Sequence, residues 1–259
     1  MYFDLDKIKE QVEQVYKEVL AFRRDLHMHP ELSEQEIRTE EKICSRLDAL
    51  QIPYQRGVAG HGVCAVIRGT TADRTVGIRA DIDALPVAEQ TELAYASLNL
   101  GVMHACGHDM HTAILLGTAA ILKQNADTLP GTVKLFFQPS EETIGGAKQM
   151  IDAGCLEDPH VENVIALHVD PMTDLGKLKF TKGCMNAATT EMELTVRGKA
   201  CHGAHPDTGI DVLPPACSIV AALQTIVSRN LAPTTPAVVT VGTFQSGTAK
   251  NVISGEAKL

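Results

Sequence analysis

The sequence predicts an α/β fold followed by a smaller second domain, and three features support this prediction. In the first part of the chain, near-continuous apolar runs, typical of strands covered on both faces, alternate with helical patterns. The helical pattern over residues 110–123 is apolar on nearly every side, which indicates a buried helix. Near residue 185 the pattern changes to an alternation of apolar and polar residues. We therefore expect one domain over residues 1–185 and a partial second domain over residues 186–259.

The elements of the first domain follow from their periodicity. Helical spacing of apolar residues predicts amphipathic helices over residues 5–26 and 36–50, and Ile37 of the second helix is expected to face inward. A polar turn containing Gly69 separates the first two strand-like runs. The other predicted elements are, in chain order, strands over 62–67 and 75–79, the buried helix over 110–123, a strand over 132–137, a short helix over 146–153 and a strand over 161–169.

The second domain is expected to contain one β-α-β unit. Met192, Leu194 and Val196 alternate with polar residues, which is the pattern of a half-exposed strand. A helix with one apolar face is predicted over residues 212–228, and a second strand over residues 237–244.

Composition excludes several classes of partner and compartment. The 259 residues include 23 basic and 32 acidic side chains, a net charge of −9, and no basic cluster, which argues against nucleic acid and anionic membranes. No apolar stretch approaches the roughly 20 residues that a membrane span requires. The N-terminal residues are too polar for a secretory signal, and seven cysteines without regular spacing do not form a disulfide framework. We therefore expect a cytoplasmic protein that acts on a small molecule.

The densest group of reactive side chains is His104-Ala-Cys106-Gly107-His108-Asp-Met-His111, in a loop that opens the buried helix. Because glycine permits an irregular backbone, Cys106 and His108 can face one point and bind a metal ion. The helix N-terminus is expected to lower the pKa of the Cys106 thiol and favour the thiolate. The alternative is that the cysteine packs as a small hydrophobe and the histidines cap the helix.

Two further groups follow predicted strands. Gln138-Pro-Ser-Glu141-Glu142 comes directly after the strand over residues 132–137, and ligands of open α/β sheets bind beyond the carboxyl ends of strands. One of the two glutamates can therefore bind a cation while the other takes a proton from water. A solvated acidic turn is the alternative. His168 ends the strand over residues 161–169, where it is either a ligand or a hydrogen-bonded core residue.

The run from Arg79 to Pro86 places Asp81 and Asp83 near the same sheet edge. Asp81 is expected to orient a ligating histidine from behind, and ordinary turn chemistry before the proline is the alternative. Four strand or loop ends thus offer sulfur, nitrogen and oxygen ligands together with a spare carboxylate. This convergence predicts a metal-dependent hydrolase. The motifs GxGxxG, GxxxxGK[ST] and GxSxG are absent from the sequence.

Several long motifs, in order, resemble one family: RRDLHMHPELSEQE, RADIDALPV, GVMHACGHDMHTA, QPSEE, ALHV and VRGKACHGAHPDTGIDV. The chain resembles the M20 metallopeptidase family, in particular its amidohydrolase branch, which hydrolyses N-acyl amino acids, hippurate and indole-acetyl amino acids. The resemblance implies a zinc-peptidase-like α/β catalytic domain with a mixed sheet flanked by helices. It also implies a partial α+β, ferredoxin-like lid domain that mediates dimerisation.

The resemblance also implies roles for individual residues. The implied metal ligands, which would hold two divalent ions of zinc, manganese or cobalt, are Cys106, His108, Glu142 and His168. Glu141 resembles the general base. His202 resembles a lid histidine that stabilises the developing oxyanion in the partner subunit's active site, and Asn251 resembles a lid asparagine near the substrate.

The leading hypothesis is a metal-dependent amidohydrolase that cleaves N-acyl amino acids or short peptides and forms a homodimer through its lid. Two departures from the family pattern weigh on it. Pro206 is followed by Asp207 where the family usually has histidine, and relatives continue beyond the position of Leu259 with a substrate-binding arginine and a last metal-ligating histidine. The alternative hypothesis is therefore a truncated, catalytically inactive metal-binding remnant or fragment of such an enzyme.

Overall fold

The computed structural model describes residues 4–143, 145–185 and 187–259. The chain divides into two compact units, residues 1–174 and residues 175–259, and each is described by itself. The expected domain boundary falls at residue 186, which lies outside the described residues. The functional division into residues 1–185 and 186–259 stays a prediction.

A five-stranded mixed sheet forms the centre of the first unit, with strand order β1-β2-β4-β3-β5. β1 pairs with β2 and β2 with β4 in antiparallel fashion, whereas β3 lies parallel to both β4 and β5. The strands are β1 (Tyr54–Val58), β2 (Gly62–Arg68), β3 (Thr75–Asp81), β4 (Thr132–Gln138) and β5 (Asn163–Ala166). The mixed α/β architecture expected from the family resemblance is therefore confirmed.

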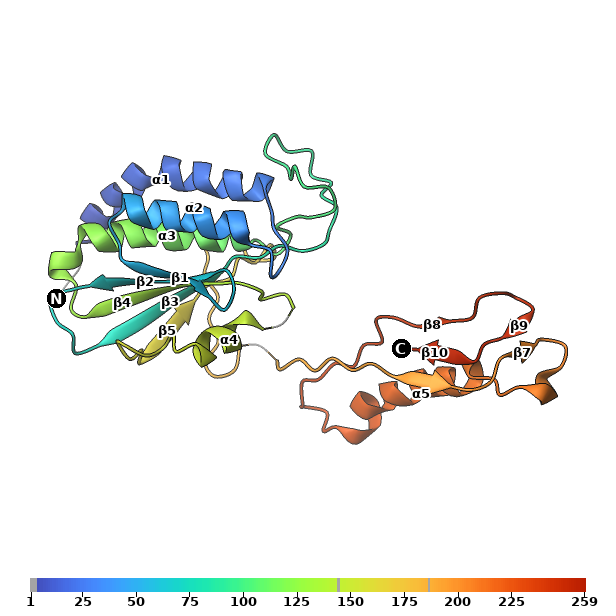
Figure 1. The fold of residues 1–259 in the computed structure, drawn as a ribbon. Helices are drawn as coiled ribbons and strands as arrows, with labels where there is room; N and C mark the ends of the chain where they lie inside the picture. The colour runs from blue at the N-terminus through green and yellow to red at the C-terminus, as the bar shows by residue number, and fades with distance from the viewer. Residues whose placement is uncertain (1–3, 144, 186) are drawn as a thin grey trace. The chain divides into compact units, whose positions relative to one another are not determined.

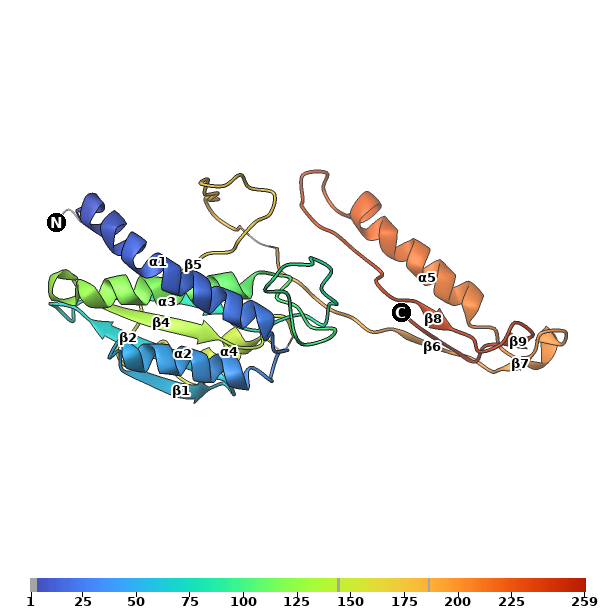
Figure 2. The same cartoon turned by 90° about the horizontal axis from the view of Figure 1, so that it is seen from above.

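Helices cover both faces of this sheet, as Figure 1 and Figure 2 show. α1, α2 and α3 lie together on one face, and α4 lies on the other. The helices of this unit are α1 (Leu5–Met28), α2 (Ile37–Ala49), α3 (His108–Gln124) and α4 (Gly146–Asp152), with a 3-10 turn at Ala126–Thr128. The predicted positions of all four helices are confirmed to within two residues at every end.

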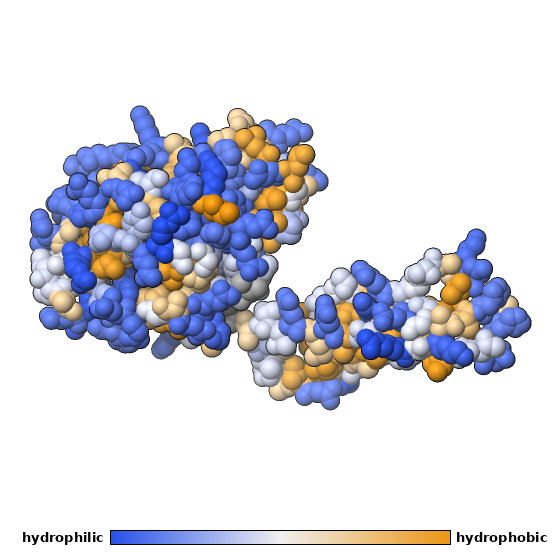
Figure 3. All heavy atoms as spheres, viewed as in Figure 1, coloured by the Kyte–Doolittle hydropathy of each residue, from blue (hydrophilic) through white to orange (hydrophobic). Residues whose placement is uncertain are grey.

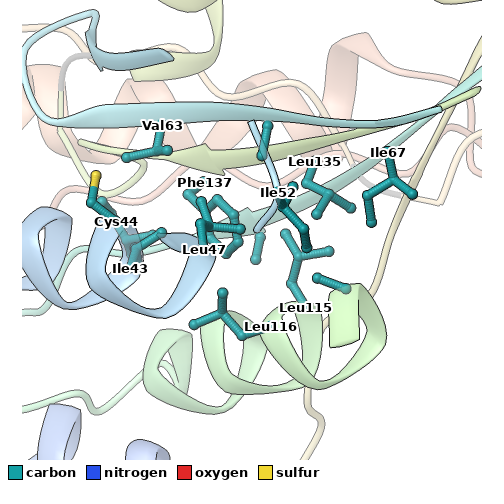
Figure 4. Packing of buried hydrophobic residues seen from close by; sticks show 14 of the residues in the cluster. Ile43, Cys44, Leu47, Ile52, Val63, Ile67, Leu115, Leu116, Leu135 and Phe137 are labelled. Atoms are coloured by element: carbon teal, nitrogen blue, oxygen red, sulfur yellow. The ribbon is translucent and has the colours of Figure 1, made fainter. Parts of the chain in front are cut away.

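The main hydrophobic core lies between the sheet and helices α2 and α3, where the side chains in Figure 4 interdigitate. Leu47 of α2 and both Leu135 and Phe137 of β4 are completely buried. α3 also packs closely on α1, because Gly117 has no side chain: a Cβ there would lie 2.8 Å from Cγ2 of Val19. This packing explains why α3 is apolar on nearly every side, and it fixes the position of the helix's first turn.

The register of β3 and β4 brings their carboxyl ends to one edge of the sheet. Because the two strands are parallel and Asp81 pairs with Gln138, both strands end at the same level. The segments that follow the two strands therefore lie side by side, with Asp83 on one and Glu141 and Glu142 on the other. The first turn of α3 lies at this same edge, since Thr112 Oγ1 donates a hydrogen bond of 2.9 Å to the carbonyl oxygen of Asp81.

The structure differs from the expectation in three places of the first unit. β1 was not predicted, because its central residues are exposed and polar and give no apolar alternation. Ile37 is 55% exposed and does not face the core. The run over residues 161–169 forms only the short strand β5, whose four residues are exposed, since β5 pairs with β3 alone among the described strands.

The second unit contains small antiparallel sheets and one long helix. β6, β10 and β8 form a three-stranded sheet, β7 pairs with β9, and Val212, Ala216 and Ala257 form the core between helix and sheet. The elements are β6 (Thr195–Arg197), β7 (Cys201–His202), a 3-10 turn (Pro206–Thr208), α5 (Leu213–Thr225), a π-helical turn (Ile226–Asn230), β8 (Gln245–Ser246), β9 (Val252–Ile253) and β10 (Glu256–Lys258).

The described structure has no strand over residues 237–244, where one was predicted; the pairing of β8 with β10 begins only at Gln245. Val238 in this run is 86% exposed, whereas Val239 and Val241 are partly buried. Met192 is exposed as well, and β6 starts only at Thr195. Among the described residues, no helix has both the length and the apolar character needed to cross a membrane.

Candidate metal centre

Gly107 lies between Cys106 and His108 at the start of α3, and the fold requires glycine at this position. Gly107 has φ +89°, and a Cβ on it would lie 2.4 Å from Cγ2 of Val169. Only glycine adopts this conformation at low cost and leaves room for the chain that follows β5. The tight backbone approach brings that following chain, and with it His168, next to Cys106.

The side chains expected as metal ligands converge around His108. Cys106 Sγ lies 3.3 Å from Nε2 of His168, and Nε2 of His108 lies 3.7 Å from Oε1 of Glu142. Ligand atoms of Cys106, His108 and His168 all lie within 4.8 Å of one another, and so do those of His108, Glu141 and Glu142. The structure thus brings together five residues predicted from sequence, taken from three separate segments of the chain.

Asp83 supports this cluster from behind. Nδ1 of His108 lies 3.1 Å from Oδ1 of Asp83, while Oδ2 accepts hydrogen bonds from Ser33 Oγ at 2.7 Å and from the backbone N–H of Glu142 at 3.0 Å. Burial raises the pKa of the Asp83 carboxyl, but the His108 ring and the other two donors outweigh it and hold the pKa below its usual range. A charged Asp83 fixes the proton of His108 on Nδ1 and leaves the Nε2 lone pair for a ligand.

Asp81 bonds to another histidine, His111, although its Oδ2 also lies 3.6 Å from Nε2 of His108. Its Oδ1 lies 2.6 Å from Nδ1 of His111, and its Oδ2 lies 2.8 Å from Nη1 of Arg79. Nε2 of His111 in turn accepts a hydrogen bond of 2.9 Å from the backbone N–H of Val169. Both nitrogens of His111 are therefore engaged, and the ring ties the His168 segment to the first turn of α3. Sequence reasoning assigned no role to His111, although its i, i+3 spacing from His108 places both on one helical face.

Two buried polar atoms of the cluster lack hydrogen-bond partners among the described residues. They are Nε2 of His108 and Oε1 of Glu142. Their separation of 3.7 Å suits two ligands of one cation, because metal–nitrogen and metal–oxygen bonds are about 2.0–2.2 Å long. Buried polar atoms are rarely left without partners, so the residues present fit a metal ion between them.

The charges around Cys106 also fit a cation. Burial, followed by the negative charges of Glu142, Asp81 and Glu141, raises the pKa of the Cys106 thiol to about 12. The expectation that the helix N-terminus lowers this pKa is therefore wrong for the metal-free chain, because desolvation and three carboxylates outweigh the helix dipole. A divalent cation at this point would offset the crowded negative charge and favour the thiolate that binds it.

Glu141 lies beside the cluster without being held by it, because its side chain is exposed whereas that of Glu142 is partly buried. Burial, and next the neighbouring charge of Glu142, raise the pKa of the Glu141 carboxyl above its usual value. A carboxylate with a raised pKa next to a cation site suits proton transfer.

His202 and Asn251 lie next to each other in the second unit. His202 pairs with Val252 across the β7–β9 ladder, and the backbone N–H of Gly203 donates to the carbonyl oxygen of Asn251 at 2.8 Å. Nδ1 of His202 accepts a hydrogen bond of 3.1 Å from the backbone N–H of Ala204. The two lid residues predicted from sequence are thus adjacent within their own unit.

A mixed sheet whose edge gathers thiol, imidazole and carboxylate groups is typical of metal-dependent hydrolases. Residues 77–249 match the family described as Peptidase family M20/M25/M40. The chain is 41% identical over 255 residues to an N-acyl-L-amino acid amidohydrolase of Geobacillus stearothermophilus, covering 98% of this chain and 68% of that protein. It is 42% identical over 237 residues to an N-acetyl-L-cysteine deacetylase of Bacillus subtilis, covering 92% of this chain and 56% of the relative. The chain belongs to the M20 peptidase family.

Solved structures show the same fold. The Bacillus subtilis YXEP protein, described as a dinuclear metal binding peptidase from the M20 family, is 37% identical with a TM-score of 0.72, covering 95% of this chain and 63% of that one. A protein from methicillin-resistant Staphylococcus aureus has a TM-score of 0.84 at 35% identity, covering 98% and 67%. The chain spans 56% and 63% of the length of the two Bacillus subtilis deacetylases that it matches.

Proposed function

We propose that this protein is a metal-dependent amidohydrolase that cleaves N-acyl amino acids to a carboxylate and a free amino acid. The observation that carries the proposal is the convergence of Cys106, His108, Glu142 and His168 around lone pairs without partners among the described residues. The names of relatives at about 40% identity, an amidohydrolase and deacetylases, support the substrate class.

Each residue of the cluster has a proposed role. Cys106, His108, Glu142 and His168 hold two divalent cations, which supply positive charge to polarise the amide carbonyl and acidify a water molecule. Glu141 takes the proton of the attacking water and delivers it to the leaving nitrogen, a contribution of roughly 10²–10⁴-fold. The thiolate suits zinc, while the imidazole and carboxylate groups also suit manganese or cobalt.

The second unit supplies the proposed lid. We place His202 at the developing oxyanion, where one such donor contributes about 3–4 kcal/mol, and Asn251 near the substrate. The family arrangement, in which the lid histidine serves the partner subunit, leads us to propose a homodimer formed through residues 186–259. Figure 3 shows apolar side chains gathered on the second unit. Leu213, Ile226 and Phe244 are among the exposed apolar residues of this unit. Exposed apolar residues that lie together favour association.

An apolar cavity adjoins the metal centre and fits a substrate with an apolar group. It has a volume of about 340 Å³ and is lined by Leu32, Ser33, Gln35, Ala84, Leu85, Pro86, Glu142 and Thr143. Since Glu142 belongs to both the cavity and the cluster, an amide bound at the cations would place one of its substituents against Leu85 and Pro86. We also propose a cytoplasmic location, for which the irregular spacing of the seven cysteines in the sequence speaks.

The variant Glu141→Gln tests the proposal. We expect it to keep the metal content of the wild-type chain, measured by elemental analysis, and to lose hydrolysis of acetyl- and benzoyl-amino acids. Wild-type activity in this variant would remove Glu141 from the role of base. Metal binding without turnover in the wild-type chain would instead favour the alternative of an inactive metal-binding remnant or fragment.

A further inference from the structure

We propose that Glu36, far from the cluster in sequence, is a positioning residue that holds the Ser140–Glu142 turn in the shape that brings Glu141 and Glu142 to the metal centre. The proposal rests on the proposed function of that centre. It assigns Glu36 no contact with substrate or metal; the residue acts only through the backbone of the turn.

The contact between Glu36 and the turn is direct and fully buried. Glu36 has no exposed surface, and its Oε1 accepts a hydrogen bond of 2.8 Å from the backbone N–H of Ser140. Glu36 occupies the N-cap position of α2, yet its side chain makes no capping bond to that helix. The carboxylate is therefore directed to a segment 104 residues away in the chain instead of to its own helix.

The turn needs such a support because its backbone is strained. Ser140 has φ +54°, a conformation that costs a residue other than glycine about 1–2 kcal/mol. A second contact from the same segment helps to hold it, since the backbone N–H of Glu34 donates to Ser140 Oγ at 3.1 Å. On the far side of the turn, the backbone N–H of Gly146 donates to the carbonyl oxygen of Ser140 at 3.1 Å, and a Cβ on Gly146 would lie 1.9 Å from the carbonyl oxygen of Pro139.

Side-chain packing around the turn does not take over the role of the hydrogen bond between Glu36 and Ser140. A cavity of about 190 Å³ adjoins the turn and is lined by Glu34, Glu36, Ala59, Gly60, His61, Ser140 and Gln149. Oε2 of Glu36 has no hydrogen-bond partner within the described part of the chain. Burying a carboxylate in which one oxygen has no hydrogen-bond partner costs free energy, and burying leucine at this position would cost less. The contact with Ser140 is the feature of Glu36 that leucine cannot reproduce.

Glu40 provides a matched control on the same helix. It is also buried, and its Oε1 accepts hydrogen bonds of 3.0 Å from Arg56 Nε and from the backbone N–H of Gly57. It therefore supports the β1–β2 hairpin, and among the described residues it makes no hydrogen bond to the turn. Replacing Glu40 by leucine removes a buried carboxylate and its partners as Glu36→Leu does, but leaves the support of Ser140 in place.

The experiment compares the full chain with its Glu36→Leu, Glu36→Gln and Glu40→Leu variants. Zinc affinity is measured by competition with a chelator, and backbone amide exchange at residues 140–142 by hydrogen–deuterium exchange. Glu36→Leu is expected to weaken zinc binding about 10–100-fold, as loss of a residue that orients a ligand does, and to speed exchange in the turn. Glu36→Gln keeps a carbonyl acceptor for Ser140 and should stay within about threefold of wild type. Glu40→Leu should lower the melting temperature and leave zinc affinity and turn exchange unchanged.

The outcomes distinguish a failure of the positioning role of Glu36 from a failure of the proposed metal centre. Wild-type zinc affinity and turn exchange in Glu36→Leu would overturn the positioning role, as would an equal loss of affinity in Glu40→Leu. If the wild-type chain binds no zinc, the proposed metal centre fails, and turn exchange alone decides the role of Glu36. Should Glu36→Leu not fold, Glu36→Asp serves instead, because its shortened carboxylate withdraws from Ser140; unchanged turn exchange there would refute the proposal.

Discussion

The substitution Asp83→Asn tests whether one carboxylate orients two of the proposed ligands. Asp83 accepts hydrogen bonds from the His108 ring, the Glu142 backbone and the Ser33 hydroxyl. Asparagine has almost the same shape but presents an NH₂ group where one oxygen was. If the NH₂ faces His108, the ring must move its proton to Nε2 and lose the lone pair for a cation. If it faces Glu142, the backbone N–H there loses its acceptor.

Either arrangement removes one hydrogen bond to a charged group, worth about 1.5–3 kcal/mol, and so weakens zinc binding roughly 10–100-fold. Chelator competition measures this change. Ser33→Ala is the control, because it removes only the hydroxyl contact at 2.7 Å and leaves His108 and Glu142 supported; a loss of about threefold or less is expected there. Asp83→Asn with zinc affinity within threefold of wild type would refute the reasoning.

Three further predictions concern the thiol, the buried glutamate and assembly. Cys106→Ser should weaken zinc binding more than manganese binding, because the hydroxyl is a harder ligand than the thiolate; equal losses in parallel titrations would argue against a sulfur ligand. Burial raises the pKa of the Glu36 carboxyl in the folded chain. The wild-type chain therefore loses stability as pH rises from the unfolded-state pKa of Glu36 to its folded-state pKa. Glu36→Gln has no carboxyl at this position and does not show this loss. The melting temperature of Glu36→Gln relative to wild type should therefore increase from about pH 4 to about pH 7, and a constant difference would contradict this sign. Light scattering at micromolar concentration should show a dimer formed through residues 186–259, or aggregates; a sharp 27.8 kDa monomer would contradict the assembly proposal.

The sequence predicted the elements around the centre because their signals are local. The apolar runs of β2, β3 and β4 and the apolar character of α3 reflect burial on both sides, and burial leaves a direct pattern in composition. β1 was not predicted, because this edge strand has polar, exposed central residues. The strand expected over 161–169 was found, but only as the short β5. The run over 237–244 shows the opposite case, since it was predicted as a strand and does not form one. An apolar run becomes a strand only where another strand pairs with it.

The support of the centre depends on register, which sequence alone does not show. Asp81 and Asp83 both lie near His108, and only the fold shows which nitrogen each one meets: Asp83 Oδ1 lies 3.1 Å from Nδ1, whereas Asp81 Oδ2 lies 3.6 Å from Nε2. The contact of Glu36 with Ser140 likewise joins segments that share no sequence pattern. The pKa of Cys106 could not be judged from its position at a helix N-terminus, since the carboxylates that raise it come from other strands.

The central claim is that Cys106, His108, Glu142 and His168 hold two divalent cations. Elemental analysis of the chain after zinc reconstitution and removal of excess metal tests it most directly, with His108→Ala as the comparison, because His108 lies at the middle of the cluster. The account predicts two zinc ions per wild-type chain and a loss of bound zinc in the variant. A wild-type chain that retains no zinc, or a His108→Ala chain that retains as much as wild type, would contradict it.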